Sequence, residues 1–346
     1  MRKIPILVVC LWCFVSMRAQ AEPAPLEIAA VADMALEDGD RMRLREAVLL
    51  LEGEPDPFLQ LNAVIVLAEE KKVEVEEAFL TLRPFEADLR LGRLRPRIGQ
   101  TLQEHRHDLD TVDEPLAIQH YFGEEGMSKT GAELTKTLFS SEGTLGIMQG
   151  GNGEEGTVFG ESERRPTVYA RIQNRFVLDT ATELELGLSD AIGSRDTDAS
   201  FEVNVLGFDA TLIHHLNSNQ ALKFQGELFN VDRSESFIDV EDPDTAVITQ
   251  QDIDGNVWGA YALADFRFHS QWAAGFRFDS VEPVDNPLEN PDKAEIGYTG
   301  YLTFHQSEFA RWRVQFSHVE LATGSDDNRV FLQGTFAIGE HKRKIQ

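Results

Sequence analysis

Hydrophobic and polar positions alternate with a period of two along most of the chain. Between residues 182 and 189, three leucines share one face and two glutamates lie on the other. Trp272 and Phe276 alternate in the same way with Arg277. This alternation indicates extended strands with one apolar and one polar face, because a helix would scatter such residues. The polar face carries charge, which the core of a β-sandwich does not tolerate.

The alternating runs predict about 16 strands, at residues 26–35, 41–52, 57–68, 73–83, 86–95, 130–139, 143–149, 166–178, 181–191, 199–215, 218–232, 256–268, 271–283, 293–307, 309–321 and 327–340. Most are near the ~9–11 residues that a tilted membrane strand needs. After the N-terminal segment, no stretch approaches the ~18 consecutive apolar residues of a membrane helix. If the chain enters a membrane, it therefore requires a closed barrel, because lipid offers no partner to a free strand edge. The expected fold is all-β, a single transmembrane antiparallel up-and-down barrel.

The connections between these runs are alternately short and long in the second half of the chain. Short turns are predicted at 179–180, 216–217, 269–270 and 308, and longer loops at 150–165, 192–198, 233–255, 284–292 and 322–326. Short periplasmic turns and long extracellular loops are typical of outer-membrane barrels. Both termini then fall on the periplasmic side, which requires an even number of strands.

Two further features refine this picture. The alternation slips in the first four runs and in 143–149, and a slip near Val205 and Leu206 predicts a β-bulge. Aromatic residues near the short-turn ends of their strands are expected to form a periplasmic girdle. They are Phe176, Phe266, Phe268, Trp272, Phe304 and Trp312.

The N-terminal residues predict export. Two basic residues at 2–3 precede an apolar run at 4–15 and the small-residue site Ala-Gln-Ala at 19–21. This pattern indicates a signal peptide at 1–21, which leaves an outer-membrane barrel at 22–346. Both cysteines, Cys10 and Cys13, lie in that leader, so the mature chain is expected to have no disulfide and no cysteine-ligated metal.

The charge distribution distinguishes the loops from the lumen. A formal net charge of -27 argues against nucleic acid as a partner and points to cations or a hydrated surface. Acidic residues concentrate in the loops at 98–129, 150–165 and 233–255, where they would attract cations and could bind Ca²⁺. The pore wall is expected to be basic instead. Its inward positions carry Arg90, Arg171, Arg175, Arg267, Arg277, Arg311 and Arg313.

The 98–129 loop is the candidate constriction, because it is the longest connection and follows the fifth strand. Its acidic residues are Glu104, Asp108, Asp110, Asp113 and Glu114. Folded against a basic wall, they would create a transverse field that favours small hydrated solutes. His105, His107 and Asp108 also form a candidate Zn²⁺ site, since imidazole and carboxylate groups are zinc ligands. The spacing is unspecific, and solvated loop histidines are the alternative.

Several motifs carry a family resemblance. They are Glu76-Glu77-Ala78-Phe79-Leu80-Thr81-Leu82, Leu91-Gly92-Arg93-Leu94, Ile98-Gly99, His105-x-His107, Asp113-x-Pro115-Leu116, Gly123-Glu124-Glu125-Gly126 and the ending from Val330 to His341. Together they resemble a family of bacterial outer-membrane barrels that includes phosphate-selective-porin-like proteins and zinc-regulated outer-membrane receptors. The resemblance covers about 40–131 and 327–341, and it implies outer-membrane lipid and the barrel-assembly machinery as partners. The chain departs from a receptor-type barrel in having no plug domain, and from a usual barrel ending in running on to Gln346.

The leading functional hypothesis is a porin for passive diffusion of small hydrophilic solutes or ions, since about 16 strands leave an aqueous lumen. A zinc-handling barrel and a non-conducting binding or adhesion barrel are the alternatives. No enzyme and no resident cofactor are expected, because a hydrolase needs a serine–histidine pair. Only His305 with Ser307, or Ser317 with His318, offer one. Both a monomer and a homotrimer fit the sequence.

Overall fold

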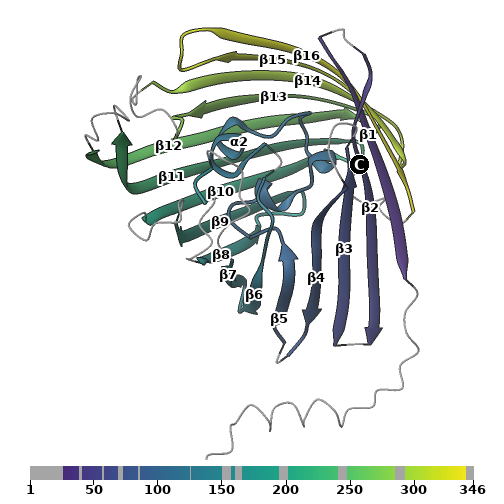
Figure 1. The fold of residues 1–346 in the computed structure, drawn as a ribbon. Helices are drawn as coiled ribbons and strands as arrows, with labels where there is room; N and C mark the ends of the chain where they lie inside the picture. Colours follow the sequence, from purple (N-terminus) through teal and green to yellow (C-terminus); the bar gives the residue numbers. More distant parts are fainter. Residues whose placement is uncertain are drawn as a thin grey trace, which may run out of the picture.

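The strands pair in chain order and close into a barrel. A computed structural model describes residues 26–38, 41–56, 58–68, 73–84, 86–124, 126–149, 157–159, 166–194, 202–240, 248–284 and 293–339. Each strand pairs antiparallel with its neighbours in sequence, and β1 pairs with β16 to close the sheet (Figure 1). The expected all-β up-and-down barrel is confirmed. The predicted signal peptide at 1–21 lies outside the described residues.

Sixteen strands are described, as the alternation predicts. They are β1 (Glu27–Glu37), β2 (Arg43–Asp56), β3 (Leu59–Leu67), β4 (Glu74–Leu82), β5 (Asp88–Leu94), β6 (Lys129–Leu138), β7 (Ser141–Met148), β8 (Thr167–Val177), β9 (Thr182–Gly193), β10 (Glu202–Asn217), β11 (Gln220–Val240), β12 (Ile248–His269), β13 (Trp272–Val281), β14 (Glu295–Ser307), β15 (Ala310–Glu320) and β16 (Asp326–Ile338). The short connections at 218–219, 270–271 and 308–309 lie at the end where β1 begins and β16 ends. We call this the short-turn end and the opposite one the long-loop end.

One predicted loop is instead largely a hairpin. β11 and β12 pair as far as Val240 with Ile248, so most of the 233–255 segment is strand. The hairpin extends past its neighbours, because the β12–β13 pairing already ends at Gly259 with Val281.

Two β-bulges account for the slipped alternation in the first strands. Opposite Asp33 and Met34 of β1, strand β2 supplies Glu46 and Leu44, so Arg45 is an extra residue. A second shift, between β3 and β4, leaves Glu76 as an extra residue beside Glu77. A bulge re-aims the extra side chain. Two consecutive polar side chains therefore face the lumen at each bulge.

The bulge expected near Val205 and Leu206 is absent, which corrects the prediction. The β10 register runs through both residues without a shift and slips only between His215 and Asn217. Val205 is buried and faces inward, while Leu206 is exposed on the outside. The alternation is hidden in the sequence because inward Val203 and Val205 and outward Leu206 and Phe208 make both faces apolar in this part of the strand.

The outer surface carries an apolar band. Exposed aliphatic and aromatic residues follow the outward positions of the strands, for example Ile192, Phe276 and Val314. Aromatic pairs lie at the short-turn ends, with ring centroids 4.7 Å apart for Trp272 and Phe304. Such a surface is stable only in contact with lipid, because in water the whole apolar band would be exposed to solvent.

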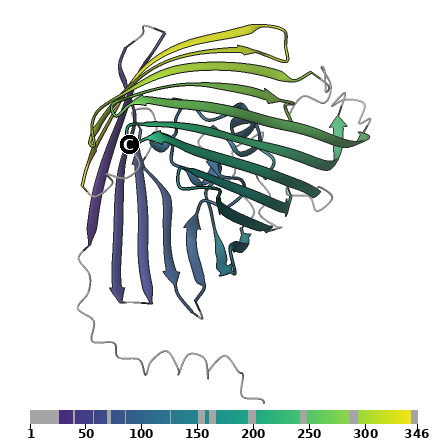
Figure 2. The same ribbon diagram turned by 180° about the vertical axis from the view of Figure 1, so that it is seen from behind.

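The segment between β5 and β6, residues 95–128, enters the barrel (Figures 1 and 2). This inner segment contains two short 3₁₀ helices, η1 (Thr101–Gln103) and η2 (Arg106–Asp108), and one α-helix, α2 (Leu116–Phe122). No helix in the described part of the chain is long and apolar enough to cross a membrane. Helix α2 buries its apolar side chains against inward-facing apolar residues of β10 to β13. These include Val203, Val205, Phe229, Val231, Val257 and Val281. One part of the lumen is therefore a packed apolar core.

Candidate functional site

The inner segment is fastened to the barrel wall through its backbone. Buried N–H groups need acceptors, and wall side chains supply them. At Gly99, a φ of +67° and the nearby Phe229 ring leave no room for a Cβ atom. Four backbone N–H groups of the segment donate to wall side chains: that of Gly99 to Ser189 (3.2 Å), of Thr101 to Glu227 (2.7 Å), of Val112 to Gln315 (2.7 Å) and of Leu116 to Asp279 (3.0 Å). The segment thus contacts strands from β9 to β15.

Three of the predicted wall arginines fasten the same segment through its carbonyl groups. Arg311 donates to the His107 carbonyl at 2.6 Å, and Arg313 donates to the Leu109 carbonyl at 3.0 Å. Arg277 donates to the Asp113 carbonyl at 2.8 Å and also bonds the Thr111 hydroxyl. All three arginines are at most 3% exposed. They support the inner segment structurally.

The other four predicted wall arginines each have a different setting. Arg90 pairs with Glu133 at 2.6 Å, and Arg171 pairs with Asp209 at 2.6 Å. Arg175 is largely exposed near the short-turn end, where it pairs with Glu183. Arg267 lines a separate 300 Å³ cavity among the short turns. The seven arginines therefore do not form one continuous basic wall.

The predicted constriction acids lie inside the barrel, most of them beside cations. Asp110 lies 2.7 Å from Lys223. Burial would raise the pKa of Asp110, but Lys223 holds it below its ordinary value. Asp113 accepts from Gln315 at 2.6 Å and lies 3.7 Å from Arg329.

Glu104, Asp108 and Glu114 complete that set. Burial raises the pKa of Glu114, although Arg106 opposes the shift from 3.6 Å away. Burial also raises the pKa of Glu104 to about 7, so this carboxyl is partly protonated at neutral pH. The buried Asp108 lies 3.8 Å from the ring of His107.

The two histidines of the candidate zinc site are held by the bulged strands. His105 lies 3.0 Å from Glu76 and 3.4 Å from Glu77. His107 lies 2.9 Å from Glu46, and the two imidazole rings stack 5.6 Å apart. Burial opposes charge on His105, but its two glutamate partners raise the pKa to about 9. A protonated imidazole cannot ligate a metal, and no group of three or more metal-binding side chains is found among the described residues.

A polar cavity that the sequence did not single out lies at the long-loop end, between the inner segment and strands β1, β2 and β16. We call it the long-loop cavity; its volume is about 480 Å³. Its basic residues are Arg41, Arg43, Arg45, Arg106 and Arg329, and its acidic residues are Glu37, Asp38, Asp113, Glu114 and Glu124. A signal was present in the sequence, since arginines at 41, 43 and 45 stand at alternate positions.

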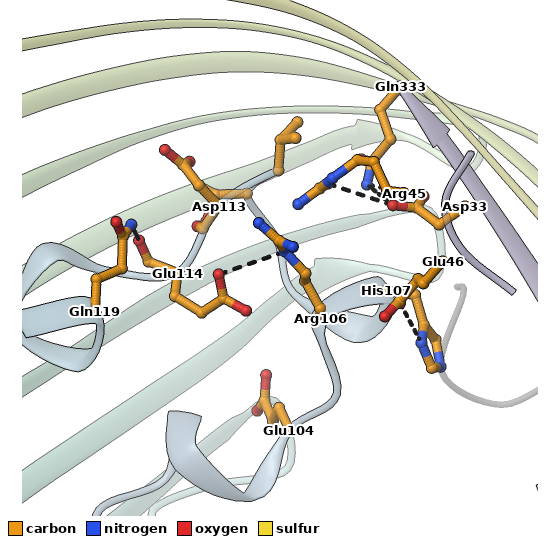
Figure 3. A network of polar contacts seen from close by, with 12 residues as sticks. Asp33, Arg45, Glu46, Glu104, Arg106, His107, Asp113, Glu114, Gln119 and Gln333 are labelled. Carbon is orange, nitrogen blue, oxygen red and sulfur yellow. Dashed lines mark hydrogen bonds and ion pairs between the residues drawn. The ribbon is translucent and has the colours of Figure 1, made fainter. Parts of the chain in front are cut away.

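Figure 3 shows how charges of the two signs are arranged here. Arg45 from the β2 bulge pairs with the buried Asp33 of β1 at 3.3 Å. Asp33 also accepts hydrogen bonds from Gln333 and Thr335 of β16. Arg106 of the inner segment reaches toward Glu114. The bulge thus joins the seam between β1 and β16 to the wall of the cavity.

The serine–histidine pairs considered from the sequence have other roles. Ser317 faces inward and bonds Gln315 and Thr299, whereas His318 bonds Asn328. Adjacent strand residues point to opposite faces. The Ser307 hydroxyl accepts from the Phe309 N–H within a short turn.

The chain was compared with known protein families, sequences and solved structures. No family model matches the chain. An uncharacterized protein of Aquifex aeolicus is 24% identical over 336 residues, covering 86% of this chain and 68% of that protein. The anion-selective porin from Comamonas acidovorans aligns with a TM-score of 0.61 and 10% identity, covering 91% of this chain and 99% of the porin. The fold is that of bacterial outer-membrane porins.

Two other outer-membrane structures share this fold. The outer membrane channel DcaP of Acinetobacter baumannii gives a TM-score of 0.61 at 9% identity, over 93% of this chain and 99% of DcaP. A trimer form of OmpT, an outer membrane protein of Vibrio cholerae, gives 0.57 at 8% identity, over 91% of this chain and 99% of OmpT. The apolar band of this porin-fold barrel faces lipid, and its location is the bacterial outer membrane.

Proposed function

We propose that this protein is an outer-membrane channel for passive diffusion of small hydrophilic solutes or ions. The observation that carries the proposal is the long-loop cavity, a polar space of about 480 Å³ inside a closed barrel. Charged groups line it from the wall and from the inner segment. Small polar solutes suit such a space, because the lining replaces some of their contacts with water.

The charges of the long-loop cavity act as its filter. Arg41, Arg43 and Arg45 project from the β2 side, while Asp113 and Glu114 belong to the inner segment. Opposed charges create an electric field across the long-loop cavity, which favours hydrated and dipolar solutes over apolar ones. Arg277 of β13 contributes indirectly, because it donates to the carbonyl groups of Asp113 and Glu114 and holds both residues in position.

The Arg43→Ala variant tests the filter. Removing one positive charge from the cavity should shift the zero-current potential in a KCl gradient toward cation preference. Arg175→Ala is the matched control, because Arg175 is 64% exposed near the short-turn end and outside this cavity. An equal shift in both variants would show that the cavity does not select ions.

The trimer form solved for Vibrio cholerae OmpT supports a homotrimer as the assembly of this barrel. A trimer would cover part of the apolar band that faces lipid in a single barrel. Cross-linking in isolated outer membranes should then give a product of three chains, and a ladder that stops at one chain would contradict this assembly.

A further inference from the structure

A second lumen cavity lies on the same wall, nearer the short-turn end. We call it the short-turn cavity; its volume is about 260 Å³. It is lined by strands β1 to β4 and by His105, with Glu52, Asn62 and Glu77 among its polar groups. The two cavities have no lining residue in common. They follow one another along the inner face of β1 and β2.

A layer of buried side chains separates the two cavities. On β1 the long-loop cavity begins at Ala35, and the short-turn cavity ends at Ala29. Between these positions lie inward-facing residues that are at most 8% exposed. They are Val31, Asp33, Glu46 and Val48, and His107 of the inner segment joins them at 0% exposure. We call these five residues the partition.

The inner segment crosses from one cavity to the other at the partition. His105 lines the short-turn cavity, whereas the next residue, Arg106, lines the long-loop cavity. His107 closes the gap to the wall, because its ring nitrogen lies 2.9 Å from the Glu46 carboxylate. On the opposite side of the inner segment, α2 and strands β10 to β13 form the apolar core. Water and ions are excluded from such packing.

From this arrangement we infer that solutes cross the barrel along the β1–β4 wall, through the two cavities in series, and that the His107–Glu46 contact between them limits the rate. The inference rests on the proposed channel function. Arg311 donates to the His107 carbonyl at 2.6 Å, so this backbone anchor does not depend on the imidazole. Replacing this side chain should open the partition and leave the inner segment anchored.

Single-channel recording in planar bilayers tests the inference. His107→Ala should raise the conductance roughly twofold or more, since a pore's resistance is dominated by its narrowest part. His107→Gln, which keeps a long polar side chain beside Glu46, should stay near the wild-type value. His120→Ala is the matched control. His120 also belongs to the inner segment and pairs with a glutamate, Glu295 at 3.0 Å, but it lies in α2 and lines neither cavity.

The outcomes separate the two proposals. A conductance of His107→Ala equal to that of wild type and His120→Ala would overturn the partition and leave the channel function standing. If neither the wild type nor any of these variants conducts, although each migrates as a folded barrel on an unheated gel, the channel function itself fails.

Discussion

Individual buried side chains at the seam of the barrel have several partners each. Asp33 is fully buried, and it accepts hydrogen bonds from Arg45, Gln333 and Thr335. These contacts join β1, β2 and β16, the strands that meet where the chain closes on itself. A charged group in this position is tolerated only because its partners are fixed around it.

Asp33→Ala should therefore destabilise the barrel. Arg45 and Gln333 would lose their acceptor inside the lumen, and breaking a buried pair on one side costs about 3–5 kcal/mol. The measurement is the urea midpoint of unfolding, with the folded and unfolded fractions read from the two bands on an unheated gel. Asp326→Ala, at an exposed position of β16, is the control and should unfold at the wild-type midpoint. Equal midpoints for Asp33→Ala and wild type would contradict this role.

At the scale of elements, the inner segment is held at both of its edges. Wall arginines and glutamates hold its backbone on the β9–β15 side, and carboxylates from the β-bulges hold His105 and His107 on the β2–β4 side. The bulges matter because an unbroken strand would point only one of Glu76 and Glu77 at His105.

This anchoring should weaken at high pH. His105 has a pKa raised to about 9 in the folded protein, against 6.5 for the free side chain. Its stabilising contribution is fully present below about pH 6.5 and is lost as the pH rises through about 9. Limited proteolysis of the inner segment should accelerate between pH 7 and 10 in the wild type. The His105→Gln variant should lack this acceleration, while the exposed His269→Gln control should keep it. The same pH profile in all three proteins would contradict the assignment.

Much of this element structure could be predicted from the sequence. Strands such as β9 and β14 alternate strictly, because lipid and water select opposite residue types on their two faces. The entry of the segment after β5 was also indicated by its length and position. Its contacts were not predictable, since Arg313 binds the carbonyl of Leu109, 204 positions away. The inward direction of Val205 was not predictable either, because this valine packs into the apolar core that α2 forms inside the barrel.

At the scale of the whole molecule, two sides of the barrel differ in what they border. Strands β10 to β13 pack against α2 and form a core, while β1 to β4 and β16 border the two polar cavities. The acidic net charge of -27 does not describe this lumen, where the long-loop cavity has five arginines and five carboxylates. Net charge therefore does not predict the ion selectivity of the proposed channel, which depends on the charges that line its cavities.

The most direct test of this account is the conductance of the purified wild-type barrel in a planar lipid bilayer. The account predicts stepwise current increases of uniform size as channel assemblies insert, because every barrel provides an aqueous route through its polar cavities. Protein that is folded and inserted into the bilayer, yet gives no current steps at any voltage or salt concentration, would contradict it.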